Sequence, residues 1–223
     1  MENWNARNAW FCTVAICLTQ FGLVIVFLIL ASDPAFHHFV RSSAGSLLLN
    51  VTGAFAALTV TLWFARCGGG LKFVDRFSIR WPKFKTSFIA LLSGALLATV
   101  PVLLINLHVG ASPENHLVRS IVGLPHADSI FLVVATIGAM VEEFILRGYL
   151  FGSFRNSYSL FWSTFCIVII AAVLHLGALS SSFLGVIVIM ALQVLLCVWR
   201  EKSGNLVYCF LAHAAYNAVC GLI

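Results

Sequence analysis

Seven apolar stretches, several of them about 20 residues long, run through this chain of 223 residues and are separated by short polar connections. A stretch of about 20 apolar residues crosses a hydrocarbon core of about 30 Å as a helix. Because 61% of the residues are hydrophobic and only 9% are charged, no soluble domain fits between the stretches. We predict an all-α, single-domain membrane protein over residues 1–223, a polytopic bundle of about seven transmembrane helices. The predicted spans are residues 10–31, 45–65, 86–108, 128–153, 159–178, 183–199 and 205–223.

Basic residues are concentrated in the connection between the second and third stretches, where Asp75 is the one acid. Loops rich in Lys and Arg stay in the cytoplasm, so this connection and the N-terminus are predicted to be cytoplasmic. The same alternation places Arg7, Arg155, Arg200 and Lys202 on the cytoplasmic side. The basic residues of the connection are Arg66, Lys72, Arg76, Arg80, Lys83 and Lys85.

Apolar and aromatic side chains alternate with these positive charges. Such a pattern is suited to lying on an anionic membrane surface, so membrane lipid is an expected partner. The net charge of +5 therefore needs no nucleic acid to explain it. The apolar members of the connection are Leu71, Phe73, Val74, Phe77, Ile79, Trp81 and Phe84.

Three ionisable residues, Glu142, Glu143 and Arg147, interrupt the fourth apolar stretch. A charge at the centre of a membrane helix costs about 3 kcal/mol on insertion scales, so such residues indicate a functional site by default. Residues four apart share a helix face, and Glu143 is therefore predicted to pair with Arg147. Glu142 projects about 100° away without a local partner of opposite charge, which makes it a candidate general base. The alternative is a helix-packing salt bridge with one glutamate that reaches a neighbouring helix.

Polar residues of two further stretches are predicted to meet Glu142: His175 in the fifth, and the cofacial pair His213 and Asn217 in the seventh. At a rise of about 1.5 Å per residue, Glu142 and His175 lie roughly 21 and 25 Å from a shared cytoplasmic turn. By the same rise, His213 and Asn217 lie roughly 14 and 20 Å from theirs. We therefore expect all four in one buried cavity, at or beyond the midplane toward the outer leaflet.

These motifs resemble those of the CAAX prenyl protease type II and bacteriocin-processing family, CPBP or ABI, of intramembrane glutamic endopeptidases. Glu142 to Arg147 is similar to the family's EExxxR signature, and His213 to Asn217 to its HxxxN motif. His175 stands where a middle FxxxH motif is expected, although Ala171 replaces the phenylalanine. The resemblance covers about residues 128–220.

The resemblance implies a metal-independent, cofactor-free endopeptidase in a bacterial inner (plasma) membrane. Glu142 would activate a water with help from His175, His213 and Asn217 would stabilise the oxyanion, and Glu143 with Arg147 would support the site. The implied substrate is a membrane-associated protein or peptide, lipidated or carrying a carboxyl-terminal or leader signal. A cavity toward the outer leaflet favours an exported protein or secreted peptide.

Other functions stay open at this stage. A zinc-dependent protease could use two histidines with the carboxylates, although the HExxH spacing is absent. A serine or cysteine protease lacks a placed nucleophile, because Ser180–Ser182 fit an outer turn and Cys209 has no evident orienting partner. A proton-coupled transporter would use the same buried charges, and an immunity protein could keep the family fold without activity.

Overall fold

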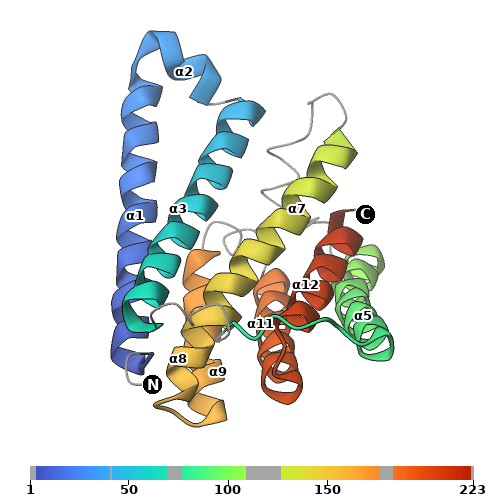
Figure 1. Cartoon of the computed structure of the whole chain (residues 1–223). Coiled ribbons are helices and arrows are strands. Elements are labelled where there is room, and N and C mark those ends of the chain that lie inside the picture. The colour runs from blue at the N-terminus through green and yellow to red at the C-terminus, as the bar shows by residue number, and fades with distance from the viewer. Residues whose placement is uncertain (1–3, 41, 70–76, 109–126, 176–182, 222–223) are drawn as a thin grey trace.

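The computed structural model describes residues 4–40, 42–69, 77–108, 127–175 and 183–221, and every regular element in these ranges is helical. Figure 1 shows the helices side by side in a bundle. The predicted all-α class is therefore confirmed. The helices are α1 (Ala6–Ser32), α2 (Pro34–Val40), α3 (Ser43–Gly69), α5 (Phe84–His108), α7 (Ala127–Glu143), the π-helix η2 (Phe144–Leu150), α8 (Phe151–Arg155), α9 (Leu160–Leu174), α11 (Phe183–Ser203) and α12 (Leu206–Gly221).

Each predicted apolar stretch contains a helix, but two details differ from the prediction. The short helix α2 was not expected; Pro34 opens it with a fixed φ, and the Asp33 side chain accepts a bond from the Ala35 N–H at 2.8 Å. The fifth helix ends at Leu174, so the prediction that His175 lies within it is wrong. His175 instead caps this helix, and residues 176–178 of the predicted span lie outside the described residues.

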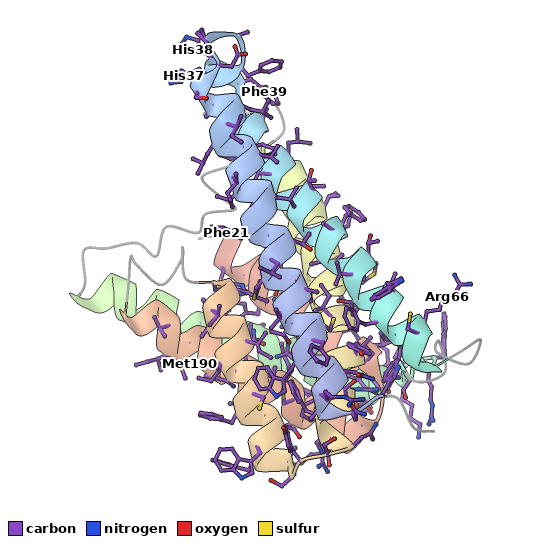
Figure 2. The ribbon with its side chains drawn as sticks, turned by 90° about the vertical axis from the view of Figure 1, so that its left-hand side faces the viewer. Phe21, His37, His38, Phe39, Arg66 and Met190 are labelled. Carbon is purple, nitrogen blue, oxygen red and sulfur yellow. The ribbon has the colours of Figure 1, made fainter. Side chains whose placement is uncertain are left out.

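Two helices, α1 and the Ser43–Cys67 part of α3, are long and apolar enough to cross a membrane by length and composition. Only 6% and 17% of their apolar windows are buried, so their side chains face outward, unlike those of a core helix. Phe21, for example, is 65% exposed on the outer side of α1 (Figure 2). Shorter apolar helices are Phe84–Thr99, Leu160–Leu174 and Leu206–Cys220, and the full set of seven spans stays a prediction.

Connections that carry basic residues meet at one end of the bundle. The side chain of Asn156 donates to the Trp4 carbonyl at 2.8 Å, and Arg155 pairs with Glu201 at 2.9 Å. The segment before α5 is bonded to Asn205 at the start of α12. These contacts bring the predicted same-side connections together, while their assignment to the cytoplasm stays a prediction. We call this end, which carries residues 4–7, 77–83, 155–159 and 200–205, the basic end.

A close helix crossing fixes α12 beside α5. A Cβ added to Gly94 on α5 would lie 1.9 Å from the Ala212 carbonyl oxygen on α12, so the two backbones are in direct contact. Small residues permit such an approach between membrane helices. Because Ala212 immediately precedes His213, this crossing sets the position of a candidate catalytic side chain.

Candidate active site

The two glutamates lie where the fourth predicted span changes from an α-helix to a π-helix. The α-helix α7 ends at Glu143, and the π-helix η2 follows without a break. The N–H of Phe151 donates to the Leu146 carbonyl five residues back, the bond that defines π geometry. π-Helices are rare and are frequently found at functional sites. Here the π-helix carries Arg147, four residues after Glu143.

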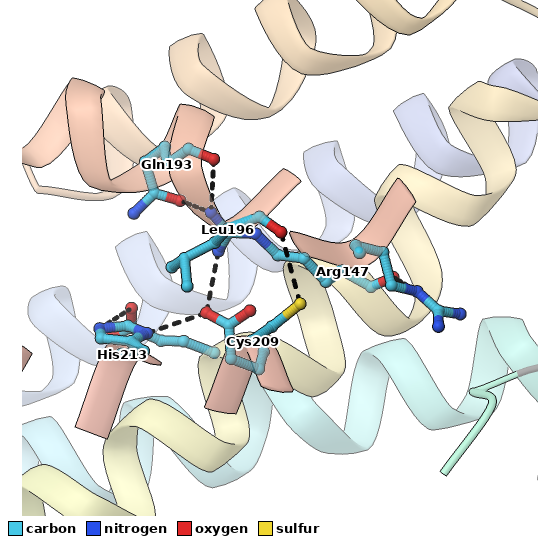
Figure 3. A network of polar contacts seen from close by, with 8 residues as sticks. Arg147, Gln193, Leu196, Cys209 and His213 are labelled. Carbon is cyan, nitrogen blue, oxygen red and sulfur yellow. Dashed lines mark hydrogen bonds and ion pairs between the residues drawn. The ribbon is translucent and has the colours of Figure 1, made fainter. Parts of the chain in front are cut away.

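Arg147 holds together a fully buried polar network (Figure 3). Its Nη1 lies 3.0 Å from Oε1 of Glu143, which confirms the ion pair predicted from their spacing. Its Nη2 donates to both the side-chain oxygen and the backbone carbonyl of Gln193 on α11. The three residues are at most 1% exposed. A buried ion pair is costly unless further hydrogen bonds accompany it, and Gln193 accepts two from Arg147.

His213 on α12 joins this network from the other side of the site. Its ring is buried, with Nδ1 2.8 Å from Oε1 of Glu143 and Nε2 3.9 Å from Oε2 of Glu142. An ionised carboxylate can only accept a hydrogen bond, so the contact with Glu143 places a proton on Nδ1. Nε2 is therefore the ring nitrogen that faces Glu142. The sequence predicted that Glu142 and His213 would meet, and it missed the bond from His213 to Glu143.

Glu142 differs from its neighbour in being accessible. Its side chain is 38% exposed, whereas that of Glu143 is 1% exposed. The separation of 3.9 Å from His213 exceeds direct hydrogen-bond length, so a water beside the pair can reach both groups. An accessible carboxylate next to an oriented imidazole is an arrangement that can activate water.

Asn217 lies one turn beyond His213 on α12, on the same face, as its spacing predicts. Its Nδ2 donates to the Ala135 carbonyl of α7 at 3.3 Å. This bond places the amide beside Ala135, which lies nearer the start of α7 than Glu142 does. A side-chain amide has two N–H groups, so the second can still donate to another acceptor.

His175 has a local partner. Its Nδ1 lies 2.8 Å from the Ala171 carbonyl of its own helix, within the part-buried cap of α9. Among the residues that the structure describes, no hydrogen bond or ion pair joins it to Glu142 or His213. Ala171 itself is completely buried, so a phenylalanine at this position would need the surrounding helices to repack.

A metal site is not formed by the described side chains: in those ranges, no group of three or more His, Cys, Asp or Glu residues is placed to hold an ion. Cys209, weighed as a nucleophile, is buried with its Sγ 3.3 Å from the Leu196 carbonyl. Ser180–Ser182, the serines weighed for the same role, lie outside the described residues.

Sequence reasoning missed two residues of the network, Gln193 and Arg200. Gln193 is a single amide in the middle of the apolar helix α11, a signal that could have drawn attention to it. Arg200 was assigned only to a cytoplasmic connection, but its Nε donates to the Arg147 carbonyl at 3.3 Å. It thereby binds a backbone oxygen of the π-helix.

One comparison with known proteins finds a match. Residues 126–219 match the family model described as "Type II CAAX prenyl endopeptidase Rce1-like". No curated protein and no solved structure gives a significant match. The matched region contains the acidic pair, Arg147, His213 and Asn217, and the apolar helices fit a membrane protein. Residues 126–219 of the chain are therefore similar to the Rce1-like type II CAAX prenyl endopeptidases, a family of proteases.

Proposed function

We propose that this chain is a membrane-embedded endopeptidase in which Glu142 activates the water that hydrolyses a peptide bond. The observation that carries the proposal is the approach of Glu142 to His213, 3.9 Å apart and contributed by different helices. His213 is itself held by the buried Glu143. An exposed carboxylate as the base, with an oriented donor beside it, meets the geometric needs of peptide hydrolysis.

In the proposed reaction, Glu142 removes a proton from a water as its oxygen attacks the scissile carbonyl carbon. The carbonyl oxygen becomes an oxyanion. As the C–N bond breaks, the leaving amine takes the proton from Glu142, which returns the carboxylate to its starting form. The products are a new carboxyl terminus and a new amino terminus.

His213 is proposed as the main donor to the oxyanion. A carboxylate lies at each ring nitrogen, so an imidazolium gives an N–H to both sides. The amide of Asn217, one turn away, is proposed as a second donor.

Glu143, Arg147 and Gln193 are proposed to position His213. Arg147 binds the same Oε1 atom of Glu143 that contacts the imidazole, so the carboxylate is fixed from both sides. Such support keeps a catalytic group within the narrow limits that the reaction needs. A role for His175 beside Glu142 follows from the family resemblance alone and is proposed on that basis.

The topology and substrate are also proposals. We propose a single seven-span domain in the plasma membrane, with the basic end and the N-terminus cytoplasmic, because the basic connections gather at that end. The family description names a CAAX prenyl endopeptidase. We accordingly propose a protein or peptide substrate held at the membrane by a lipid group near its carboxyl terminus, or by a leader sequence.

The test is cleavage in proteoliposomes of two probes, a farnesylated peptide ending in a CAAX sequence and a membrane-tethered leader peptide. Wild type is compared with Glu142→Ala, His175→Ala and His213→Ala, each with and without chelator. Removal of the base should lower the rate by about 10²- to 10⁴-fold, and chelator should change nothing. Equal rates in wild type and Glu142→Ala would refute the proposed site. Loss of wild-type activity on chelation would favour the zinc mechanism instead.

A further inference from the structure

The segment 77–83, which leads into α5, has an ordered backbone although it contains no helix. The side chain of Asn205 binds Arg80 twice, accepting from its N–H at 3.2 Å and donating to its carbonyl at 3.0 Å. The N–H of Lys83 donates to the Tyr208 hydroxyl at 2.8 Å. Both partners belong to the first residues of α12 or its cap, so the segment is fastened to the helix that carries His213.

The start of the same segment is fastened to the π-helix. Phe77 is 2% exposed, and a Cβ on Gly148 would lie 2.4 Å from its ring, so the ring packs directly on that glycine. Ser78 follows with a φ of 52°, the left-handed conformation that turns the chain outward. The segment therefore contacts two elements of the proposed site, the π-helix that carries Arg147 and the helix α12 that carries His213.

The side chains after this turn are highly exposed. Trp81 is 95% exposed and Phe84 is 89% exposed, the highest values among the exposed large hydrophobic side chains of the described residues. Arg80, Lys83 and Lys85, which alternate with them, are exposed as well. Aromatic rings with a polar neighbour are enriched at membrane–water interfaces, and basic residues there attract anionic headgroups.

We propose that residues 77–85, the anchor segment, bind the headgroups of anionic phospholipids, with Trp81 and Phe84 inserted among them. Charge favours this occupant: three cations alternate with two bare aromatic rings, and the segment carries no acid. Each basic residue at such a surface contributes about five-fold in affinity. Because the anchor segment packs on the π-helix and is hydrogen-bonded to Asn205 and Tyr208 of α12 and its cap, the bound lipid fixes the elements that hold Arg147 and His213.

Native mass spectrometry of the delipidated full chain, titrated with phosphatidylglycerol or phosphatidylcholine, tests the lipid site. Wild type should bind phosphatidylglycerol at least several-fold more tightly, and the double variant Lys83→Glu with Lys85→Glu should lose the preference. The matched control, Arg7→Glu with Lys202→Glu, changes the net charge equally at exposed residues outside the segment and should keep it. An absent preference in wild type, or equal loss in both variants, overturns the proposal.

Tryptophan emission gives a second reading that needs no charge change. Brominated lipids quench tryptophans they touch, so Trp81→Phe should remove part of the emission that brominated phosphatidylglycerol quenches. Trp81 is exposed, so this variant should fold as wild type does. An unchanged quenched fraction would show that the ring does not lie among the lipids.

The effect on the site rests on the proposed protease function, whereas lipid binding does not. With the farnesylated peptide as substrate, wild type should cleave faster in phosphatidylglycerol than in phosphatidylcholine, and Lys83→Glu with Lys85→Glu should not. Preserved lipid preference without any peptide cleavage would refute the protease proposal and leave the lipid proposal standing. A variant that keeps lipid preference but shows a raised KM for acidic peptides would identify the segment as a substrate surface and overturn the lipid proposal.

Discussion

The Nδ1 atom of His213 lies 2.8 Å from Oε1 of Glu143, although 70 residues separate them in the chain. The same oxygen receives Nη1 of Arg147 at 3.0 Å. One buried carboxylate thus joins the arginine of the π-helix to the imidazole of α12. Within the part of the chain that the structure describes, the adjacent Glu142 is joined to this cluster only by its approach to Nε2 of His213. Replacement of Glu143 should therefore affect stability, whereas replacement of Glu142 should affect the reaction rate.

Glu143→Gln should destabilise the protein, because it leaves the Arg147 charge buried without its counter-ion. Removing one partner of a buried ion pair costs about 3 to 5 kcal/mol. Thermal unfolding in detergent should show a clearly lowered midpoint. Glu142→Gln, at a side chain that is 38% exposed, is the control and should unfold within a degree or two of wild type. Equal unfolding midpoints for the two variants would contradict the assignment of a structural role to Glu143 and a chemical role to Glu142.

Gln193→Leu should remove a side-chain acceptor from Arg147 and put an apolar side chain of similar size in its place. A hydrogen bond to a charged group contributes about 1.5 to 3 kcal/mol, so both stability and the orientation of His213 should suffer. We expect kcat for the farnesylated peptide to fall by at least about ten-fold with KM little changed, because Gln193 acts through other residues.

Gln193→Glu is the matched variant, since it keeps an oxygen facing Arg147. It should recover most of the lost kcat. A result in which both replacements act alike, or in which only KM moves, would show that Gln193 does not position the site.

Gly94→Ala should disturb the crossing of α5 and α12. The added Cβ would lie 1.9 Å from a backbone oxygen, which cannot move aside as a side chain would, and overpacking of this kind costs about 1 to 3 kcal/mol or more. Gly138→Ala on α7 is the control, because nothing lies within 4 Å of its added Cβ. Unfolding temperature and cleavage rate should both drop for Gly94→Ala alone. A tolerated alanine at residue 94 would contradict the close backbone contact.

The Arg155–Glu201 pair at the basic end predicts a pH effect on stability. The hydrogen bond from Arg155 holds the pKa of Glu201 below its usual value, so the pair contributes stability at neutral pH and loses it as the carboxylate is protonated. Both side chains are about one-third exposed, which limits the contribution to about 1 kcal/mol or less.

Glu201→Gln should accordingly lower the unfolding midpoint slightly at pH 7, and the difference from wild type should shrink as the pH falls through the lowered pKa of Glu201. Midpoints recorded between pH 3 and pH 8 check this. A difference that grows as the pH falls would have the wrong sign for the ion pair.

Local spacing made part of the site predictable. The turn of an α-helix brings residues four apart together, which gave the Glu143–Arg147 pair and the shared face of His213 and Asn217. Hydrophobic runs gave the helical class, because length and apolarity determine which stretches form helices in lipid. These features depend on the sequence within one helix and not on how helices pack.

Contacts between helices were not predictable in the same way. The π-helix after Glu143 arises from no residue pattern that we can identify, and the bond from Glu143 to His213 depends on the packing of α7 against α12. Gln193 required knowing which face of α11 meets Arg147. The helix containing His175 was predicted to continue through it, but the chain ends α9 one residue earlier.

The central claim is that the accessible Glu142 does the chemistry. The most direct measurement is the initial rate of peptide cleavage by wild type and Glu142→Gln in the same proteoliposomes, with thermal unfolding recorded on the same samples. Glutamine keeps the size of the side chain and cannot accept the proton from water at neutral pH. The account predicts matching unfolding midpoints and a rate lowered by at least about 10²-fold. Cleavage by Glu142→Gln at the wild-type rate would contradict it.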